Sequence, residues 1–291
     1  MKDLLAIRQM VAQALDILPE QVAEISRIGG LTNKNYACVT PVGKVVVRCP
    51  GEGTECMIDR RVEMAHTLLA ERQGWHPQVL YFGQDGLKIS QYVAAAETLQ
   101  ASTVAEDDIL RSVAQILRKL HQSDLVMQRE IEYRNEFDLY IRGCGEIDTK
   151  LYPIWPDLLA GMPAILKRLA ELGVECCPCH NDLVPENWLR TEDRLYLLDW
   201  EYSANNDPAW DLASFMGECR LAVDVREKFL SYYYEGSVSS VAREKILIYE
   251  WLQHMLWFVW TLLKEKHGVF YGDYGRKRLY EAQRLFEELQ R

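Results

Sequence analysis

The sequence has no apolar run long enough to cross a membrane. Its most apolar stretch, Met255 to Leu263, has nine residues between two polar ones, about half of the length that a helical span requires. The N-terminal residues carry charges within an apolar pattern and lack a small-residue cleavage site, so they do not form a secretory signal. We expect no membrane insertion, a buried helix around residues 255–263 and an amphipathic helix at the N-terminus.

Positive charge is also scarce. The chain has 33 lysines and arginines against 43 aspartates and glutamates, which gives a formal net charge of −10. Such a surface repels the phosphates of nucleic acids and mildly favours a cationic substrate. With 48% hydrophobic and 26% charged residues, the composition is that of an ordinary globular protein with one large or two modest cores.

The cysteines lack the spacing of a disulfide framework or a complete zinc site. There are eight, mostly scattered, and without an export signal they indicate reduced thiols in a cytoplasm. The one cluster, Cys176-Cys177-Pro178-Cys179, contains a C-x-x-C that could be a redox pair or half of a zinc site. No second C-x-x-C or histidine pair completes a tetrahedral site, so we expect a small buried strand there.

What the sequence does contain is one loop with a specific spacing of polar residues. The segment His180-Asn181-Asp182-Leu183-Val184-Pro185-Glu186-Asn187 is followed, twelve residues after its end, by Asp199. In protein kinases the catalytic loop reads His-x-Asp-Leu, with an asparagine five residues after the aspartate. That aspartate accepts the proton of a substrate hydroxyl, while the asparagine and a second aspartate hold Mg²⁺ on the triphosphate of ATP. The spacing predicts Asp182 as the catalytic residue and Asn187 and Asp199 as Mg²⁺ ligands, with ATP as the phosphate donor and His180 supporting the loop.

The alternative is that these polar residues only form turns. Against it, Trp188-Leu189 and Leu195 to Leu198 are short apolar segments on either side of a polar turn. Two such segments form a hairpin. The hairpin would bring Asn187 and Asp199 side by side at one end.

The pattern of strands and helices predicts an α+β protein with two lobes. Residues 1–92 contain mostly short strands, turns and one main helix, and residues 93–291 contain mostly long helical patterns. We expect a small nucleotide-binding lobe, a larger catalytic and substrate-binding lobe, and a site at their junction, because closure excludes water from phosphoryl transfer. The expected strands are residues 22–28, 36–40, 44–48, 79–82 and 87–90, and the expected helices are residues 54–74, 107–121, 136–142, 158–172, 209–221, 225–234, 244–266 and 274–289.

Candidate nucleotide-binding residues lie in the first lobe. The strand-turn-strand segment at residues 28–36 has glycines and small polar residues, among them Asn33 and Asn35, that would let backbone N–H groups approach phosphate oxygens. At the lobe boundary, the backbone groups of Gln91 and Val93 are expected to bind the adenine.

A cation and a carboxylate in this lobe have the arrangement that kinases use for the α and β phosphates. Arg48 ends a predicted strand, fifteen residues before Glu63 on the following helix. Kinases pair a strand lysine with a helix glutamate. Arginine is a departure, but a guanidinium also binds phosphate, through two parallel hydrogen bonds. Glu63 could equally be a surface carboxylate.

Six segments of the sequence match motifs of one enzyme family: Gly29-Gly30-Leu31-Thr32-Asn33-Lys34-Asn35-Tyr36, Gly51-Glu52-Gly53-Thr54-Glu55, Cys179 to Asn187, Asp199-Trp200-Glu201-Tyr202-Ser203, Asp207-Pro208-Ala209-Trp210-Asp211-Leu212-Ala213 and Gly272-Asp273-Tyr274-Gly275. They resemble the bacterial choline kinases that feed phosphorylcholine decoration of surface glycans, within the wider choline/ethanolamine kinase and aminoglycoside phosphotransferase group. The resemblance runs over nearly the whole chain. It implies a protein-kinase-like fold and ATP-dependent phosphorylation of choline to phosphocholine, and it matches Asp211 to a residue that braces the catalytic loop.

The resemblance assigns substrate residues mainly to the C-terminal part. Trp257 and Trp260 are three apart and share one face of a predicted helix, and with Tyr274 they match aromatic residues that line the family's choline pocket. An aromatic face attracts a desolvated quaternary ammonium by roughly 0.5–2 kcal/mol. Glu218 matches a carboxylate near the ammonium, and Tyr202 matches a tyrosine of the pocket.

Other interpretations stay open at this point. An aromatic-rich helix is often simply core, and kinases for ethanolamine, thiamine or aminoglycosides share the same loop. Ethanolamine would depend on carboxylates more than on aromatic faces, and an aminoglycoside would require a broad acidic surface. An alternative of another class is a catalytically silent protein that only binds nucleotide. The sequence carries no signal of oligomeric state.

Overall fold

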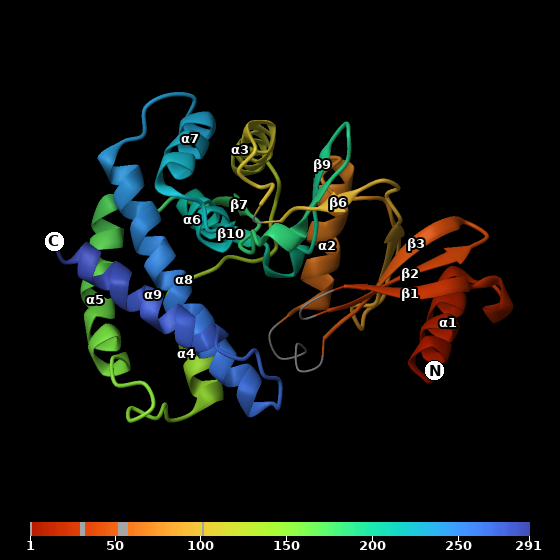
Figure 1. Ribbon diagram of the computed structural model, residues 1–291, viewed down its shortest axis with the longest axis horizontal. Helices are drawn as coiled ribbons and strands as arrows, with labels where there is room; N and C mark the ends of the chain where they lie inside the picture. The colour runs from red at the N-terminus through yellow and green to blue at the C-terminus, as the bar shows by residue number, and fades with distance from the viewer. Residues whose placement is uncertain (1, 30–32, 52–57, 101) are drawn as a thin grey trace. The chain divides into compact units, whose positions relative to one another are not determined.

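The computed structural model describes residues 2–29, 33–51, 58–100 and 102–291, with side chains from residue 4 onward. These residues form two compact units (Figure 1). The first unit combines Met1–Leu99 with Glu186–Tyr202, and the second combines Gln100–Pro185 with Ser203–Arg291. The chain therefore passes between the units more than once.

A five-stranded antiparallel sheet forms most of the first unit, in the order β1-β2-β3-β5-β4. Successive side chains of a strand point to opposite faces, so Val45 and Val47 share one face, where both are fully buried. The helix α1 (Lys2–Leu15) lies beside the sheet (Figure 1). Its Ile7 and Val11 belong to the same buried core as Val45 and Val47. The strands are β1 (Ala23–Gly29), β2 (Lys34–Thr40), β3 (Gly43–Cys49), β4 (Val79–Phe82) and β5 (Lys88–Gln91).

The helix α2 (Arg60–Arg72) begins at a capped residue. The Asp59 carboxylate accepts hydrogen bonds from the N–H groups of Arg61 (2.9 Å) and Val62 (3.4 Å), while its own backbone is extended. We expected a helix that starts at residue 54, which lies outside the described residues. Residues 58–59 are not helical, because the N-cap at Asp59 sets the start of α2 at Arg60. The buried face of α2 repeats every three or four residues and consists of Glu63, His66, Thr67 and Ala70.

A later segment of the chain completes the first unit. The strands β8 (Trp188–Arg190) and β9 (Leu195–Leu197) form the predicted hairpin, and β8 also pairs with β6 (Glu97–Thr98). The N–H of Leu197 donates to the carbonyl of Trp75 at 2.7 Å. The sequence assigned this hairpin to the second lobe. It packs with the first unit because its pairing partners, although distant in sequence, lie there.

Helices form most of the second unit, and each of the seven predicted ones is present. Some ends differ by a few residues because caps decide them; the Ser239 hydroxyl, for example, accepts the Ala242 N–H at 3.1 Å and starts α8 earlier than expected. A short sheet joins β7 (Cys177–Cys179) to β10 (Ala204–Asn206). The helices are α3 (Asp107–His121), α4 (Tyr133–Cys144), α5 (Trp155–Leu172), α6 (Pro208–Glu218), α7 (Val223–Tyr234), α8 (Ser240–Lys266) and α9 (Tyr274–Leu289).

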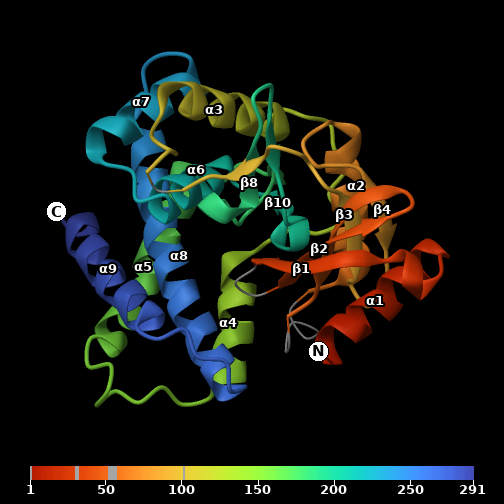
Figure 2. The same ribbon diagram turned by 45° about the vertical axis from the view of Figure 1, so that its right-hand side comes forward.

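The long helix α8 is the core of the second unit. It contacts α4, α5, α6 and α9, and Figure 2 shows α9 and α5 beside it. Phe258 packs against Trp155, and Trp251 stacks on Phe286. By length and hydropathy α8 could cross a membrane, but 83% of its apolar window is buried inside the protein. The predicted buried helix around residues 255–263 is thus confirmed.

Asp207 caps α6 and pairs with a lysine of α8, so its removal should cost more than the loss of an ordinary cap. Its buried carboxylate caps α6 through the Ala209 N–H (2.9 Å) and pairs with Lys245 (2.7 Å). Asp207→Ala leaves that lysine buried without its close partner, and we expect a loss of about 3–5 kcal/mol in the free energy of unfolding by urea. The exposed cap variant Asp59→Ala is the control, with an expected loss of about 0.5–1 kcal/mol. Equal losses in the two variants would contradict this account.

Candidate active site

Arg48 is the centre of a buried charge cluster in the first unit. Its side chain on β3 is only 6% exposed, and its Nη1 forms ion pairs with the carboxylates of Glu63 on α2 and of Asp199, the latter at 2.7 Å. Its Nη2 donates to the carbonyl of Gly86 at 3.1 Å. Burial acts to lower the pKa of Arg48, but the three carboxylates around it, Asp199 first, outweigh burial and raise that pKa. The structure therefore brings together the strand cation and the helix carboxylate that the sequence singled out.

A second pair of residues, which the sequence analysis missed, completes the cluster. Arg60 contacts Glu63 at 2.7 Å and Glu201 at 3.0 Å. Burial raises the pKa of Glu201 to about 7, and the charge of Asp199 acts in the same direction. A signal for both was present in the sequence, since Arg60 precedes Glu63 by one helical turn and Glu201 follows Asp199 by two residues.

Asp199 has an unusual backbone and the most accessible carboxylate of the cluster. Its φ is +59°, a left-handed conformation that only a few residue types adopt readily. The Nδ2 of Asn33 donates to its Oδ2 at 3.0 Å, and the Oδ1 of Asn33 accepts the Gly51 N–H at 3.2 Å. The Asp199 side chain is 23% exposed, whereas Glu63 and Glu201 are at 0% and 4%.

The carboxylates of this cluster suit Mg²⁺. Ligand oxygens of Glu63, Asp199 and Glu201 lie within 4.8 Å of one another, and Mg²⁺ prefers such hard oxygen donors. Asn187 is the last residue of a short 3₁₀ turn, Pro185–Asn187. Its carbonyl accepts the Leu198 N–H at 2.7 Å, so its main chain lies beside the residue that precedes Asp199. The hairpin thus brings the two predicted metal ligands to neighbouring positions of the main chain.

Three other residues that are predicted to bind the nucleotide lie on or next to the strands β2 and β5. Asn35 on β2 is half-buried and stands opposite Arg48 in the sheet. Gln91 is exposed at the end of β5, where its N–H donates to the Gln78 carbonyl at 2.8 Å. Val93, two residues later, is half-buried. Residues 30–32 and 52–57, which belong to two of the family motifs, lie outside the described residues.

In the second unit, one buried carboxylate fixes the start of the predicted catalytic loop. Asp211 on α6 accepts the N–H of His180 at 2.8 Å and the N–H of Asn181 at 2.7 Å. Asn181 has a φ of +71°, so the two hydrogen bonds hold the loop in a left-handed turn immediately before Asp182. This arrangement agrees with the bracing role that the family resemblance implied for Asp211.

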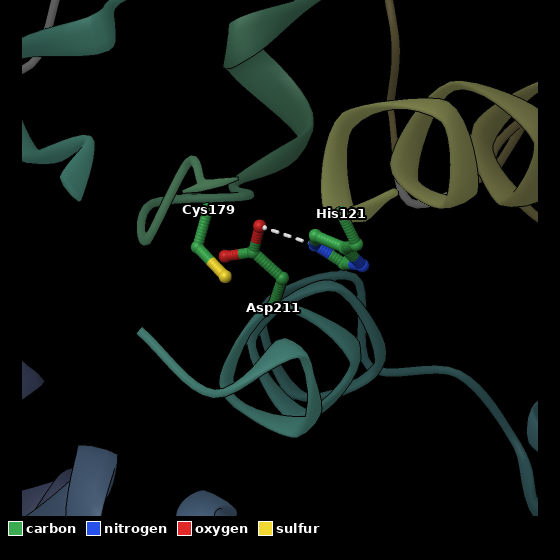
Figure 3. Close-up of side chains that lie close together, drawn as sticks. All are labelled: His121, Cys179 and Asp211. Carbon is green, nitrogen blue, oxygen red and sulfur yellow. Dashed lines mark hydrogen bonds and ion pairs between the residues drawn. The ribbon is translucent and has the colours of Figure 1, made fainter. Parts of the chain in front are cut away.

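His121 on α3 extends this bracing. Its Nε2 lies 3.1 Å from Asp211 Oδ2, and its Nδ1 lies 2.8 Å from the hydroxyl of Tyr233 on α7. Figure 3 shows the imidazole pointing at the carboxylate, with the Cys179 thiol on the other side. The sequence analysis missed His121, because nothing local in the helical pattern of residues 107–121 distinguishes a histidine that contacts a residue 90 positions away.

Asp182 follows the braced turn and is half-buried. Its N–H donates to Nδ1 of His180 at 3.3 Å, and the next N–H, of Leu183, donates to the Ser214 hydroxyl at 3.1 Å. His180 thus holds the loop from within, as predicted. The backbone on both sides of Asp182 is anchored while its side chain remains partly accessible.

The cysteine cluster leads into this loop as a strand. Cys177 and Cys179 lie on β7 with their sulfurs 3.8 Å apart, and the seven cysteines among the described residues are all free thiols. His121, Cys179 and Asp211 have potential metal-ligand atoms within 4.8 Å of one another. All three are buried, however, and two of them already hydrogen-bond each other to hold the loop (Figure 3). A structural role in holding the loop is therefore sufficient to explain why these three residues lie together.

Four aromatic rings gather at the end of α8 and the start of α9. Trp260 lies 6.0 Å from Trp257, 6.5 Å from Tyr274 and 5.1 Å from Tyr271, measured between ring centroids. The sequence analysis missed Tyr271, three residues before Tyr274. Burial raises the pKa of Tyr274, and the negative charges of Glu218 and Asp182 act in the same direction. Asp182, the predicted catalytic residue, is therefore close enough to this aromatic cluster to interact with it electrostatically.

Glu218 and Tyr202 differ from the other predicted substrate residues. Both carboxylate oxygens of Glu218 contact Nη2 of Arg278, at 2.6 and 2.5 Å, so this carboxylate already has a cationic partner within the protein. Tyr202 is half-buried in the 3₁₀ turn Trp200–Tyr202 of the first unit. Its role beside the aromatic cluster stays a prediction.

The cluster around Arg48 should be required for stability even without a ligand. Arg48→Met leaves the fully buried Glu63 without its ion pair to β3. We expect a loss of about 3–5 kcal/mol in the free energy of unfolding, measured by urea denaturation. The double variant Arg48→Met with Glu63→Gln should lose less than the single variant, because it buries one charge fewer. Arg111→Met, which breaks an exposed ion pair with Asp107, is the control and should cost less than about 1 kcal/mol. A double variant less stable than Arg48→Met alone would refute the coupling.

Comparison with known proteins agrees with this arrangement. The family model for choline/ethanolamine kinase matches residues 25–237. Protein LicA of Haemophilus influenzae is 32% identical over 286 residues, which cover 95% of this chain and 84% of that protein. The crystal structure of the choline kinase LicA from Streptococcus pneumoniae superposes with a TM-score of 0.85 at 33% identity, covering 98% of both chains.

A structure of LicA in complex with AMP also matches, with a TM-score of 0.85 at 32% identity and 98% coverage of both chains. These matches confirm the predicted α+β, protein-kinase-like fold class and the predicted enzyme class. The family model spans well over half of the chain. The chain belongs to the choline/ethanolamine kinase family.

Proposed function

We propose that this protein transfers the γ-phosphoryl group of ATP to the hydroxyl oxygen of choline, giving phosphocholine and ADP. The observation that carries the proposal is the aromatic cluster of Trp257, Trp260, Tyr271 and Tyr274, which lies in the same unit as the catalytic loop. The negative charge of Asp182 acts on Tyr274. The matched Streptococcus pneumoniae protein is a choline kinase, which supports the same substrate.

Aromatic rings are suited to the head group of choline. A quaternary ammonium has no N–H to donate to a carboxylate, and it is attracted by the faces of tryptophan and tyrosine rings. Trp257 and Tyr274 are half-buried, so parts of both rings are accessible. In this proposal the cluster binds the ammonium group, and Tyr202 is a further substrate-binding residue.

Asp182 acts on the other end of the substrate. In the transfer, the hydroxyl oxygen forms a bond to the γ-phosphorus while the bond to the leaving ADP oxygen breaks. Asp182 accepts or orients the hydroxyl proton, and its anchored backbone keeps its carboxylate in position. A substrate held at its ammonium by the aromatic cluster presents its hydroxyl in one orientation, which lowers the entropic cost of reaction.

The charge cluster of the first unit is the proposed binding site for the triphosphate. Arg48, oriented by Glu63, binds the α and β phosphates, and the backbone around Asn33 and Asn35 approaches the phosphate oxygens. The backbone of Gln91 and Val93 binds the adenine. The matched LicA–AMP complex supports a nucleotide ligand.

Asp199 and Asn187 would hold Mg²⁺, and Asp199 is the carboxylate of the cluster that is partly exposed. Mg²⁺ bound to the triphosphate neutralises charge that develops during transfer. Glu63 and Glu201 are paired with arginines and are far more buried than Asp199, so in this proposal they position the site and Asp199 supplies the carboxylate ligand. The free thiols of the described residues fit the proposed cytoplasmic location, and the acidic net charge of −10 disfavours a nucleic acid partner.

Turnover with a panel of acceptors tests the proposed reaction. ADP release should require Mg²⁺ and be selective for choline over ethanolamine, thiamine and an aminoglycoside. Asp182→Ala should lower kcat by about 10²–10⁴-fold, the usual contribution of a positioned general base, while its circular dichroism spectrum stays that of the wild type. Selective turnover of another acceptor would refute choline as the substrate, and an unchanged rate in the variant would refute the role of Asp182.

Removing one ring tests the aromatic cluster separately. Trp257→Ala should raise the KM for choline by about 2–30-fold, the equivalent of one cation–π contact, and have a smaller effect with ethanolamine. Trp257→Phe should recover part of the loss. Trp251→Phe, a change on the same helix in a fully buried tryptophan that stacks on Phe286, is the control for general damage to α8. Equal and small effects on both substrates would remove Trp257 from the site.

A further inference from the structure

Arg278 is a buried cation that contacts the aromatic cluster directly. It lies on α9 one turn after Tyr274, and its side chain is 9% exposed. Its Nη2 contacts both oxygens of Glu218 on α6, at 2.6 and 2.5 Å, and also donates to the hydroxyl of Tyr274 at 2.7 Å. Its Nη1 lies 3.4 Å from Nδ1 of His254 on α8. One guanidinium therefore joins three helices beside the proposed pocket.

The contact with Arg278 places a positive charge among the negative charges that act on Tyr274. The ionised groups that affect Tyr274 are Glu218, Arg278 and Asp182. Glu218 is the carboxylate on α6, and its negative charge is balanced by Arg278. His254 adds no positive charge, because burial and the neighbouring Arg278 lower its pKa to about 3. The neutral imidazole can accept a hydrogen bond from the guanidinium and helps to hold it in place.

Arg278 also fixes the Tyr274 ring. Its guanidinium carbon lies 4.6 Å from the ring centroid, over one face, while the hydroxyl of the same ring accepts its hydrogen bond. A ring held at both its face and its hydroxyl is restricted in rotation. The ring of Trp260 stands edge-on to Tyr274, with the two ring centroids 6.5 Å apart.

This arrangement treats two kinds of ammonium differently. A primary ammonium has three N–H donors that lose water on binding and require acceptors. A carboxylate is the strongest such acceptor, but both oxygens of Glu218 contact Arg278, whose positive charge offsets the negative charge of the carboxylate. A quaternary ammonium needs no acceptor and is attracted by aromatic faces alone. Binding ethanolamine through Glu218 would bring its ammonium close to the positive charge of Arg278, unless the ion pair opened.

We propose that Arg278 is a specificity-determining residue, which favours quaternary over primary ammonium substrates by engaging Glu218 and fixing Tyr274. This inference rests on the proposed function of the same site. It assigns to Arg278 a role that neither the sequence motifs nor the aromatic residues reveal. Arg278 acts through Glu218 and Tyr274, so it positions the site and takes no part in the chemistry.

The test compares choline with ethanolamine in matched variants, by kcat/KM and by the binding constant from titration calorimetry. Arg278→Gln frees the Glu218 carboxylate, and the preference for choline, taken as the ratio of the two values, should fall by about tenfold or more, as expected for a gained charge-assisted hydrogen bond. The double variant Arg278→Gln with Glu218→Gln removes that carboxylate and should restore most of the preference. Arg278→Lys keeps the positive charge and should lower the ratio less.

A control variant separates specificity from general damage. Arg226→Gln breaks another Arg–Glu pair of the second unit, with Glu250 at 2.7 and 2.9 Å, and should leave the ratio unchanged. If Arg278→Gln weakens both substrates equally, or the double variant does not recover the ratio, Arg278 has only a structural role and the inference is overturned. If Arg278→Gln does not fold, Arg278→Lys decides, and an unchanged ratio in it overturns the inference.

The two binding constants also separate this inference from the proposed reaction. Wild-type protein that binds choline without phosphorylating it would refute the proposed function, while the binding ratio would still decide the role of Arg278. Wild-type protein that binds neither ammonium compound would refute both.

Discussion

The hydrogen bonds that the buried Asp211 carboxylate accepts from the loop backbone are the interaction on which the catalytic loop depends. A buried carboxylate is costly unless it is fully hydrogen-bonded, and here the N–H groups of His180 and Asn181 and the ring of His121 supply the partners. Asn181, whose N–H is one of these partners, has a left-handed backbone. The energetic need to satisfy one charge therefore also fixes the position of Asp182.

The same physical constraint recurs at the other functional clusters. In the first unit Arg48 and Arg60 satisfy Glu63 and Glu201, and in the second unit Arg278 satisfies Glu218. Buried ion pairs add little net stability, but breaking one is costly because a charge stays behind without a partner. Such pairs therefore keep side chains in one arrangement, and binding sites built on them need little rearrangement when a ligand arrives.

Much of the site was predictable from residue spacing. The His-x-Asp-Leu loop, the fifteen residues between Arg48 and Glu63, and the short hairpin that follows Asn187 are local patterns, and the structure contains the hairpin and the ion pair. His121 and Arg278 were missed for a common reason. Each contacts a carboxylate on α6, 90 and 60 residues away respectively, and a helical pattern shows which face is buried without showing which residue it meets.

The sequence by itself determined the α+β class, the helices and the catalytic-loop motif, because these depend on periodicity and short-range spacing. The aromatic residues of α8 were assigned through the family resemblance. Only the tertiary structure decided that residues 186–202 pack with the N-terminal sheet, that Asp59 rather than an earlier residue starts α2, and that Glu218 already has a cationic partner. Strand pairing and the pairing of buried charges join residues far apart in the chain. Their partners are selected by packing, burial and the cost of an unpaired charge, which appear only when the chain is folded.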